Sequence, residues 1–71
     1  MEHYKNITAD GLRSYMDSHH EHDFMLVDVR QLKEYRAGHI AGAVLMPLSE
    51  LSARMIELPV DRDVVFYWRS G

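Results

Sequence analysis

The residues with the greatest chemical interest stand at the end of the chain, where the apolar run Val64 to Tyr67 leads into Trp68-Arg69-Ser70-Gly71. An uninterrupted apolar run of this length is typical of a strand buried on both faces of a parallel sheet. Open parallel α/β folds bind their ligands at the carboxyl ends of the strands. The loop formed by residues 68–71 is therefore the first candidate site.

Trp68 occupies the position where this loop would present a reactive group. Its indole N–H donates a hydrogen bond but offers no nucleophile for a covalent intermediate. The chain has no cysteine, which excludes disulfides, thiolate metal sites and thiol nucleophiles in this polypeptide. Two interpretations stand side by side: Trp68 replaces a nucleophile, or it is an apolar plug that packs at the end of a strand. Arg69 is likewise either an anion ligand or a solvated side chain.

Asp28 and Arg30 form a second polar pair, at the end of the apolar run Phe24 to Val29. Residues two apart in an extended segment start on the same side of the chain. A local ion pair is therefore expected, and Arg30 with Glu34 at i, i+4 would add only about 0.2–0.5 kcal/mol.

The histidines suggest structure more than catalysis. His39 follows Gly38 and is expected to be a turn residue with a structural hydrogen bond. The segment His19 to Asp23 contains three histidines and two carboxylates. We expect solvated side chains and no metal site there, because a specific site needs fixed geometry and supporting hydrogen bonds.

Short elements alternate along the chain. Strands are predicted over 5–7, 24–29, 43–46 and 64–67, and helices from Thr8 to about 18, over 31–37 and over 49–57. Thr8 fits an N-cap and Asp10 a first helical turn, whereas Gly38 is expected to end its helix in a left-handed conformation. The apolar periodicity predicts inward-facing side chains at Leu12, Tyr15, Met16, Leu32, Tyr35, Leu48, Leu51, Met55 and Leu58. Strand–helix alternation with connections this short predicts an α/β fold with a parallel sheet and right-handed crossovers.

Composition narrows the functional classes. The chain has 71 residues, enough for one domain, and it is 46% hydrophobic and 27% charged, as in ordered globular proteins. A net charge of −3 gives no drive toward nucleic acid or anionic lipid. The apolar runs are too short to cross a bilayer, and the first six residues lack the apolar core of a secretory signal. A cytoplasmic location is the expectation.

Several short strings together resemble the rhodanese homology domain. They occur in order, at the family's spacing and over essentially the whole chain. They are Leu26-Val27-Asp28-Val29-Arg30, Glu34-Tyr35, Gly38-His39-Ile40-Ala41-Gly42-Ala43, Pro47-Leu48, Leu58-Pro59, and Val64 to Tyr67 ahead of Arg69-Ser70-Gly71.

The resemblance implies sulfur transfer. In this family a cysteine directly after the fourth strand takes sulfane sulfur from thiosulfate or a similar anionic donor, holds it as a persulfide and passes it to a thiophilic acceptor, with no cofactor. The resemblance also implies that Asp28 and Arg30 border and support the active loop. Two departures follow: Trp68 stands at the nucleophile position, and the sequence stops before the family's last helix and strand. We therefore expect residues 1–71 to form a single partial domain without sulfurtransferase activity of its own.

In the family's sheet the last strand lies between the first and the fourth. Its absence predicts an open slot flanked by unpaired backbone, which invites self-association, strand addition by a partner segment, or poor folding.

Other functions stay open beside this one. The chain could be a non-catalytic module that binds an anion at Arg69 or a peptide by strand addition, or a fragment of a longer active sulfurtransferase. The dual-specificity phosphatases share the fold, but their chemistry needs the same missing cysteine.

Overall fold

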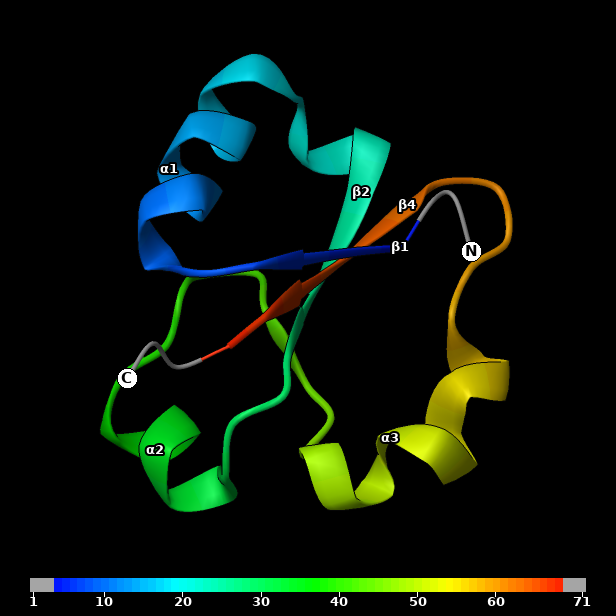
Figure 1. Ribbon diagram of the computed structural model, residues 1–71. Helices are drawn as coiled ribbons and strands as arrows, with labels where there is room; N and C mark the ends of the chain where they lie inside the picture. Colours follow the sequence, from blue (N-terminus) through cyan, green and yellow to red (C-terminus); the bar gives the residue numbers. More distant parts are fainter. Residues whose placement is uncertain (1–3, 69–71) are drawn as a thin grey trace.

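A computed structural model describes residues 4–68 as four strands with helices between them (Figure 1). In chain order the elements are β1 (Tyr4–Ile7), α1 (Ala9–Ser18), the 3-10 turn η1 (Glu21–Asp23), β2 (Phe24–Asp28), α2 (Leu32–Ala37), β3 (Val44–Leu45), α3 (Leu48–Arg54), the 3-10 turn η2 (Met55–Glu57) and β4 (Asp63–Tyr67). The predicted strand–helix alternation is confirmed. No helix of the described part of the chain is long and apolar enough to span a membrane.

The strands form one sheet in the order β1-β4-β2-β3, and every pair is parallel. The two central strands, β2 and β4, carry the most apolar sequences, FMLVD and DVVFY. A strand with neighbours on both sides and layers on both faces needs such a sequence, because no surface of it reaches water. Asp28 pairs with Tyr67 in the ladder, so the carboxyl ends of β2 and β4 lie side by side at one end of the sheet.

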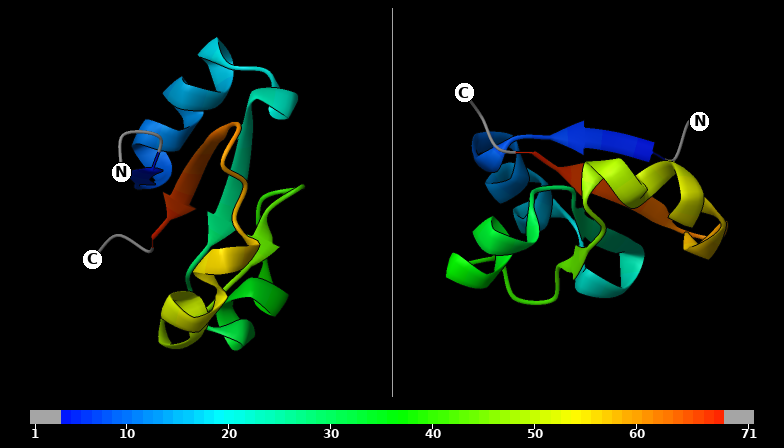
Figure 2. Two further views of the ribbon diagram at one scale, coloured as in Figure 1. Left: turned by 90° about the vertical axis from the view of Figure 1, so that its right-hand side faces the viewer. Right: turned by 90° about the horizontal axis from the view of Figure 1, so that it is seen from below.

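Side chains alternate between the two faces of the sheet and form two apolar clusters. On one face Leu26 and Val65 pack with Leu12 of α1, and Tyr35 of α2 lies against the same cluster. On the opposite face Val27 and Val64 pack with residues from the α3 side of the molecule, including Met46, Leu51 and Leu58. Helices α1 and α2 therefore cover one face and α3 the other (Figure 2).

The predicted open slot between the first and fourth strands is wrong. Strand β1 pairs directly with β4 at four positions, from Tyr4 opposite Val64 to Ile7 opposite Tyr67. The physical reason is that β4 is buried, and unpaired backbone groups along its edge would be costly. Strand β1 supplies the partners, so β1 and β3 are the outer strands of the sheet.

The helical faces were predicted only in part. Leu12, Tyr15 and Leu58 are buried as expected, and Tyr35 and Leu51 pack against the core from partly buried positions. The other four predicted positions are exposed: Met16, Leu32, Leu48 and Met55. Helices α2 and α3 have six and seven residues and contain no fully buried side chain. A helix of two turns beside a narrow sheet presents only a few positions to the core.

Four local predictions also need correction: the length of β3, the end of the third helix, the conformation of Gly38 and the side-chain cap at Thr8. Strand β3 has two residues instead of four, and the third helix becomes a 3-10 turn after Arg54. Gly38 ends α2, but with φ of 163°, which is extended backbone and not left-handed. Gly42 has φ of +88°, a conformation that favours glycine in the turn before β3. Thr8 is at the N-cap of α1 but makes no side-chain capping bond.

Tyr15 connects α1 to the start of β4. Its hydroxyl donates a hydrogen bond of 3.1 Å to Asp63 Oδ2, across 48 residues of sequence, and its ring meets Phe24 edge-on. Burial of the phenol, with the hydrogen bond to Asp63 and that carboxylate's charge, raises the pKa of Tyr15 to about 12.

This raised pKa predicts a loss of stability at alkaline pH. The folded state holds the phenol proton more tightly than the unfolded chain does, so the contribution is complete below pH about 10 and disappears as pH rises to about 12. Tyr15→Phe should cost about 1 kcal/mol at neutral pH through loss of the hydrogen bond. The variant should also flatten the decline over that pH window, which urea denaturation at a series of pH values measures. Parallel declines in the two proteins would contradict this assignment.

Candidate functional site

The carboxyl end of β2 is built around Asp28. Its side chain has no solvent exposure and accepts hydrogen bonds only from Arg30 among the described residues. The Arg30 backbone N–H donates to Oδ1 at 3.0 Å, and its guanidinium meets both carboxylate oxygens, with Nε at 2.9 Å from Oδ1 and Nη2 at 2.8 Å from Oδ2. The expected ion pair is confirmed, and it is bidentate and largely buried.

Arg30 contacts three elements at the carboxyl ends of the strands. Its Nη2 also donates to the Gly38 carbonyl at 2.8 Å, after the end of α2, and its guanidinium lies 5.3 Å from the ring centre of Tyr67 in β4. The hydrogen bonds to Asp28 raise the pKa of Arg30 above its usual value. The charge of Arg30 therefore serves to fix β2, the end of α2 and the end of β4 relative to one another.

Trp68 follows β4 directly and is bound to the fold by two hydrogen bonds. Its backbone N–H donates to the Ile7 carbonyl at 3.1 Å, which extends the pairing between β1 and β4 by one residue. Its indole Nε1–H donates to Asn6 Oδ1, also at 3.1 Å. The partly buried ring packs against the apolar cluster on the α3 face of the sheet. This environment favours the interpretation of Trp68 as a packing residue.

A pocket of about 240 Å³ lies at this edge of the sheet, beside Trp68. Its lining residues are Val29, Arg30, Gln31, Glu34, Leu48 and Trp68. Arg30 is already bound to Asp28, and the Glu34 carboxylate accepts the Gln31 backbone N–H in the first turn of α2. None of the six lining side chains is a nucleophile of the kind that sulfur transfer requires. The described lining of this pocket therefore offers no thiolate that could accept sulfur.

The sequence predicted that Asp28, Arg30 and Trp68 lie at the carboxyl ends of the central strands, and the structure places them there. Arg69, Ser70 and Gly71, the rest of the predicted loop, lie outside the described residues. The supporting role of Asp28 and Arg30 toward that loop therefore stays a prediction.

His39 has the structural role that was expected of it. Its Nδ1 lies 2.8 Å from the Tyr35 carbonyl oxygen, and its ring stacks on the Tyr35 ring at 3.7 Å. Because a carbonyl only accepts, Nδ1 carries the proton in this contact. Tyr35 also donates its hydroxyl to the Ala43 carbonyl at 2.8 Å, which holds the turn before β3 against α2.

His19 repeats this arrangement at the end of α1, and sequence reasoning missed it. Its Nδ1 lies 2.9 Å from the Tyr15 carbonyl oxygen, and its ring stacks on Tyr15 at 3.9 Å. The available signal was the repeated spacing of four residues from tyrosine to histidine at a helix end. Within residues 4–68, no group of three or more histidine, aspartate or glutamate side chains is placed to hold a metal ion.

Comparison with known proteins adds independent information. A family model described as the rhodanese-like domain matches residues 8–71. An HTH-type transcriptional regulator of Mycobacterium tuberculosis is 57% identical over 46 residues, which cover 65% of this chain and 20% of that protein. A protein named sulfurtransferase from Allochromatium vinosum is 47% identical over 49 residues, 69% of this chain and 46% of that protein. A probable adenylyltransferase/sulfurtransferase of M. tuberculosis is 37% identical over 67 residues, 92% of this chain and 17% of that protein. The chain thus spans less than half the length of these relatives.

The buried ion pair predicts that removing Arg30 alone costs more stability than removing both charges of the pair. Arg30→Met keeps the apolar stem but leaves the Asp28 carboxylate buried and unpaired, which should cost about 3–5 kcal/mol of unfolding free energy. Adding Asp28→Asn should recover part of that loss, because no unpaired charge then remains in the core. Urea denaturation of both variants measures the difference. A cost below about 1 kcal/mol for Arg30→Met, the usual range for exposed pairs, would contradict the structural role of this pair.

Proposed function

Because this chain belongs to the rhodanese-like domain family, we propose that it is a domain of sulfurtransferase ancestry that carries no sulfur itself and acts by binding. The observation that supports this most directly is the environment of Trp68. The residue at the family's nucleophile position is a tryptophan that packs on the core and donates its indole N–H to Asn6. The chain contains no cysteine to take over the role.

The requirements of sulfur transfer explain why we propose that this chain carries no sulfur. Sulfur transfer needs a thiolate that attacks the donor, forms a sulfur–sulfur bond and expels sulfite or a similar leaving group. No side chain of the pocket beside Trp68 offers such a sulfur atom. Thiosulfate, the family's type of donor, would therefore find no acceptor atom for its sulfur among these side chains.

We propose ligand binding, without sulfur transfer, as the function of the site at the carboxyl ends of the strands. A small anion held by loop 68–71 is the version that the family resemblance supports, with residues 1–71 as one partial domain. The cytoplasmic location and the lack of nucleic-acid binding stay predictions from the sequence. Phosphatase chemistry has no support from the described residues, since it requires the same missing thiol.

A second candidate rests on the length of the relatives. Since the chain spans less than half of each relative compared above, it is alternatively a fragment of a longer sulfurtransferase. Its contribution would then be a binding surface next to a thiol that lies elsewhere in such a protein.

The experiment is a search for sulfur bound to the protein after incubation with thiosulfate. Intact-mass spectrometry should show the unmodified protein for wild type, because no thiolate is present to form a persulfide. Trp68→Cys should gain one sulfur atom, although the smaller side chain should cost stability, at the lower end of the about 3–5 kcal/mol typical of Trp→Ala in cores. Trp68→Phe is the matched control and should stay unmodified.

Two outcomes would contradict the proposal. A sulfur adduct on wild type would show that the chain carries sulfur without a cysteine. An unchanged Trp68 fluorescence spectrum at millimolar thiosulfate, sulfate and phosphate would remove the anion-binding version, since Trp68 is the chain's one tryptophan and adjoins Arg69.

A further inference from the structure

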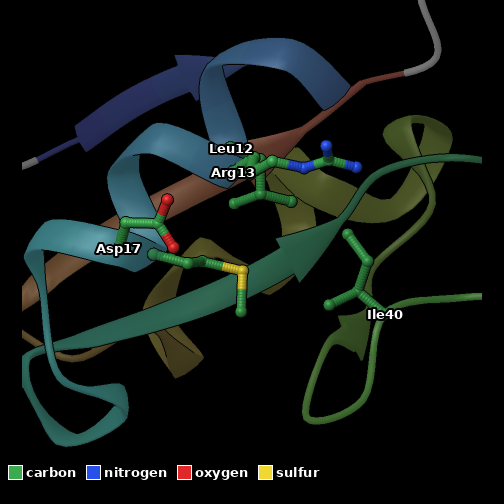
Figure 3. Close-up of a pocket in the computed structure, with 5 residues that line it drawn as sticks. Leu12, Arg13, Asp17 and Ile40 are labelled. Atoms are coloured by element: carbon green, nitrogen blue, oxygen red, sulfur yellow. The ribbon is translucent and has the colours of Figure 1, made fainter.

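A groove lies between α1 and the segment that contains Ile40 (Figure 3). It has a volume of about 410 Å³ and is lined by Leu12, Arg13, Met16, Asp17 and Ile40. In Figure 3 Ile40 faces the helix across the gap, and the charged ends of Arg13 and Asp17 lie toward opposite ends of it. Met16 also lines a smaller adjoining pocket with Phe24 and Leu26, so the apolar floor continues toward the core. We call this surface the α1 groove.

The α1 groove offers both apolar contact and charge. Met16 is 40% exposed although it belongs to the apolar side of α1. Arg13 and Asp17 are exposed, and the side chain of neither makes a hydrogen bond or ion pair with another described residue. A group that fills the groove could therefore bury Met16 and pair with both charges.

A complementary surface lies on the connection from α3 to β4. Ile56 and Val60 are 93% and 89% exposed, the highest values among the large hydrophobic residues of the described chain. They flank the buried Leu58 in sequence, and we call them the Ile56/Val60 knob. Asp61 and Arg62 follow directly, are exposed, and make no ion pair within residues 4–68. The knob thus carries one acidic and one basic side chain next to two exposed apolar ones.

We propose that the Ile56/Val60 knob of one copy docks into the α1 groove of a second copy. Asp61 then faces Arg13 and Arg62 faces Asp17, so both unpaired charges of each surface meet an opposite charge. The contact buries side chains that are exposed in the single molecule, which provides the apolar part of the driving force.

The positions of the two surfaces determine the type of assembly. In Figure 1 α1 and the segment before β3 lie on the left of the molecule, and the connection from η2 to β4 lies on the right. Because the groove and the knob are different surfaces on opposite sides, the contact is head-to-tail and leads to rings or open chains of molecules. It replaces the sheet slot, which pairing of β1 with β4 closes, as the route to self-association.

The association should be weak. Two apolar side chains and two rim ion pairs make an interface at the small end of the range, of the kind that is transient. Exposed ion pairs are also screened by salt. The complex should therefore form at high protein concentration and dissociate further as ionic strength rises.

Sedimentation velocity with two single-surface variants tests the contact. Wild type should sediment faster as its concentration rises from micromolar to millimolar. The groove variant Met16→Glu and the knob variant Ile56→Ser/Val60→Ser should each stay monomeric. Their mixture should form complexes of two chains and nothing larger, because it contains one intact groove and one intact knob. A wild type that stays monomeric throughout, or a mixture that does, overturns the proposal.

A second test, which exchanges the charges of the two surfaces, applies if Met16→Glu perturbs folding. Arg13→Asp/Asp17→Arg alters exposed residues only and should weaken association, and adding Asp61→Arg/Arg62→Asp in the same chain should restore it. Failure of this rescue overturns the assigned contact. Leu32→Ser is the matched control, since Leu32 is an exposed apolar residue on α2 outside both surfaces. Loss of association in this control would show non-specific apolar contact and would also overturn the proposal.

Discussion

The structure depends on β4 having a partner along both of its edges. This strand is buried on both faces, so its backbone N–H and C=O groups have no access to water and must be paired within the sheet. Strand β2 pairs with one edge at five positions, and β1 pairs with the other at four. The positions of Asp28, Arg30 and Trp68 all follow from these two ladders.

The pairing of β1 with β4 changes what Trp68 does. It places Asn6 and Ile7 beside the residue that follows the strand, and both accept a hydrogen bond from it. Trp68 thereby extends the contact between β1 and β4 through both its backbone and its side chain. On the other side, pairing of β2 with β4 places the Asp28–Arg30 pair against Tyr67. Among the described residues, the carboxyl ends of β2 and β4 are thus held together by an ion pair and by contacts of Arg30 and Trp68.

Much of the fold could be predicted from local patterns. The apolar runs Phe24 to Val29 and Val64 to Tyr67 indicated strands covered on both faces, and the α/β class followed from the short strand–helix connections. The partner of β1 could not be predicted in this way, because strand order depends on contacts between residues about sixty positions apart. The family resemblance led to the wrong expectation of an open slot, since in the family's sheet the last strand lies between the first and the fourth.

The exposed helix residues illustrate a second limit. Leu32 and Leu48 have helical apolar spacing, but periodicity identifies only which side chains share a face. Whether that face is covered depends on the length of the helix and on the width of the sheet beneath it. The local apolar spacing determines neither of these. The same limit applies to the site: the spacing of Asp28 and Arg30 predicted their pairing, but the bond from Arg30 to Gly38 requires the fold.

The Trp68 indole packs against the core and donates a hydrogen bond to Asn6, so it is an integral part of the fold. Solvent exchange of the indole N–H, followed by NMR, tests this most directly. An indole bound to Asn6 should show slowed exchange and a nuclear Overhauser contact between its N–H proton and the Asn6 side chain. Exchange at the rate of a free indole, with no contact to Asn6, would contradict it.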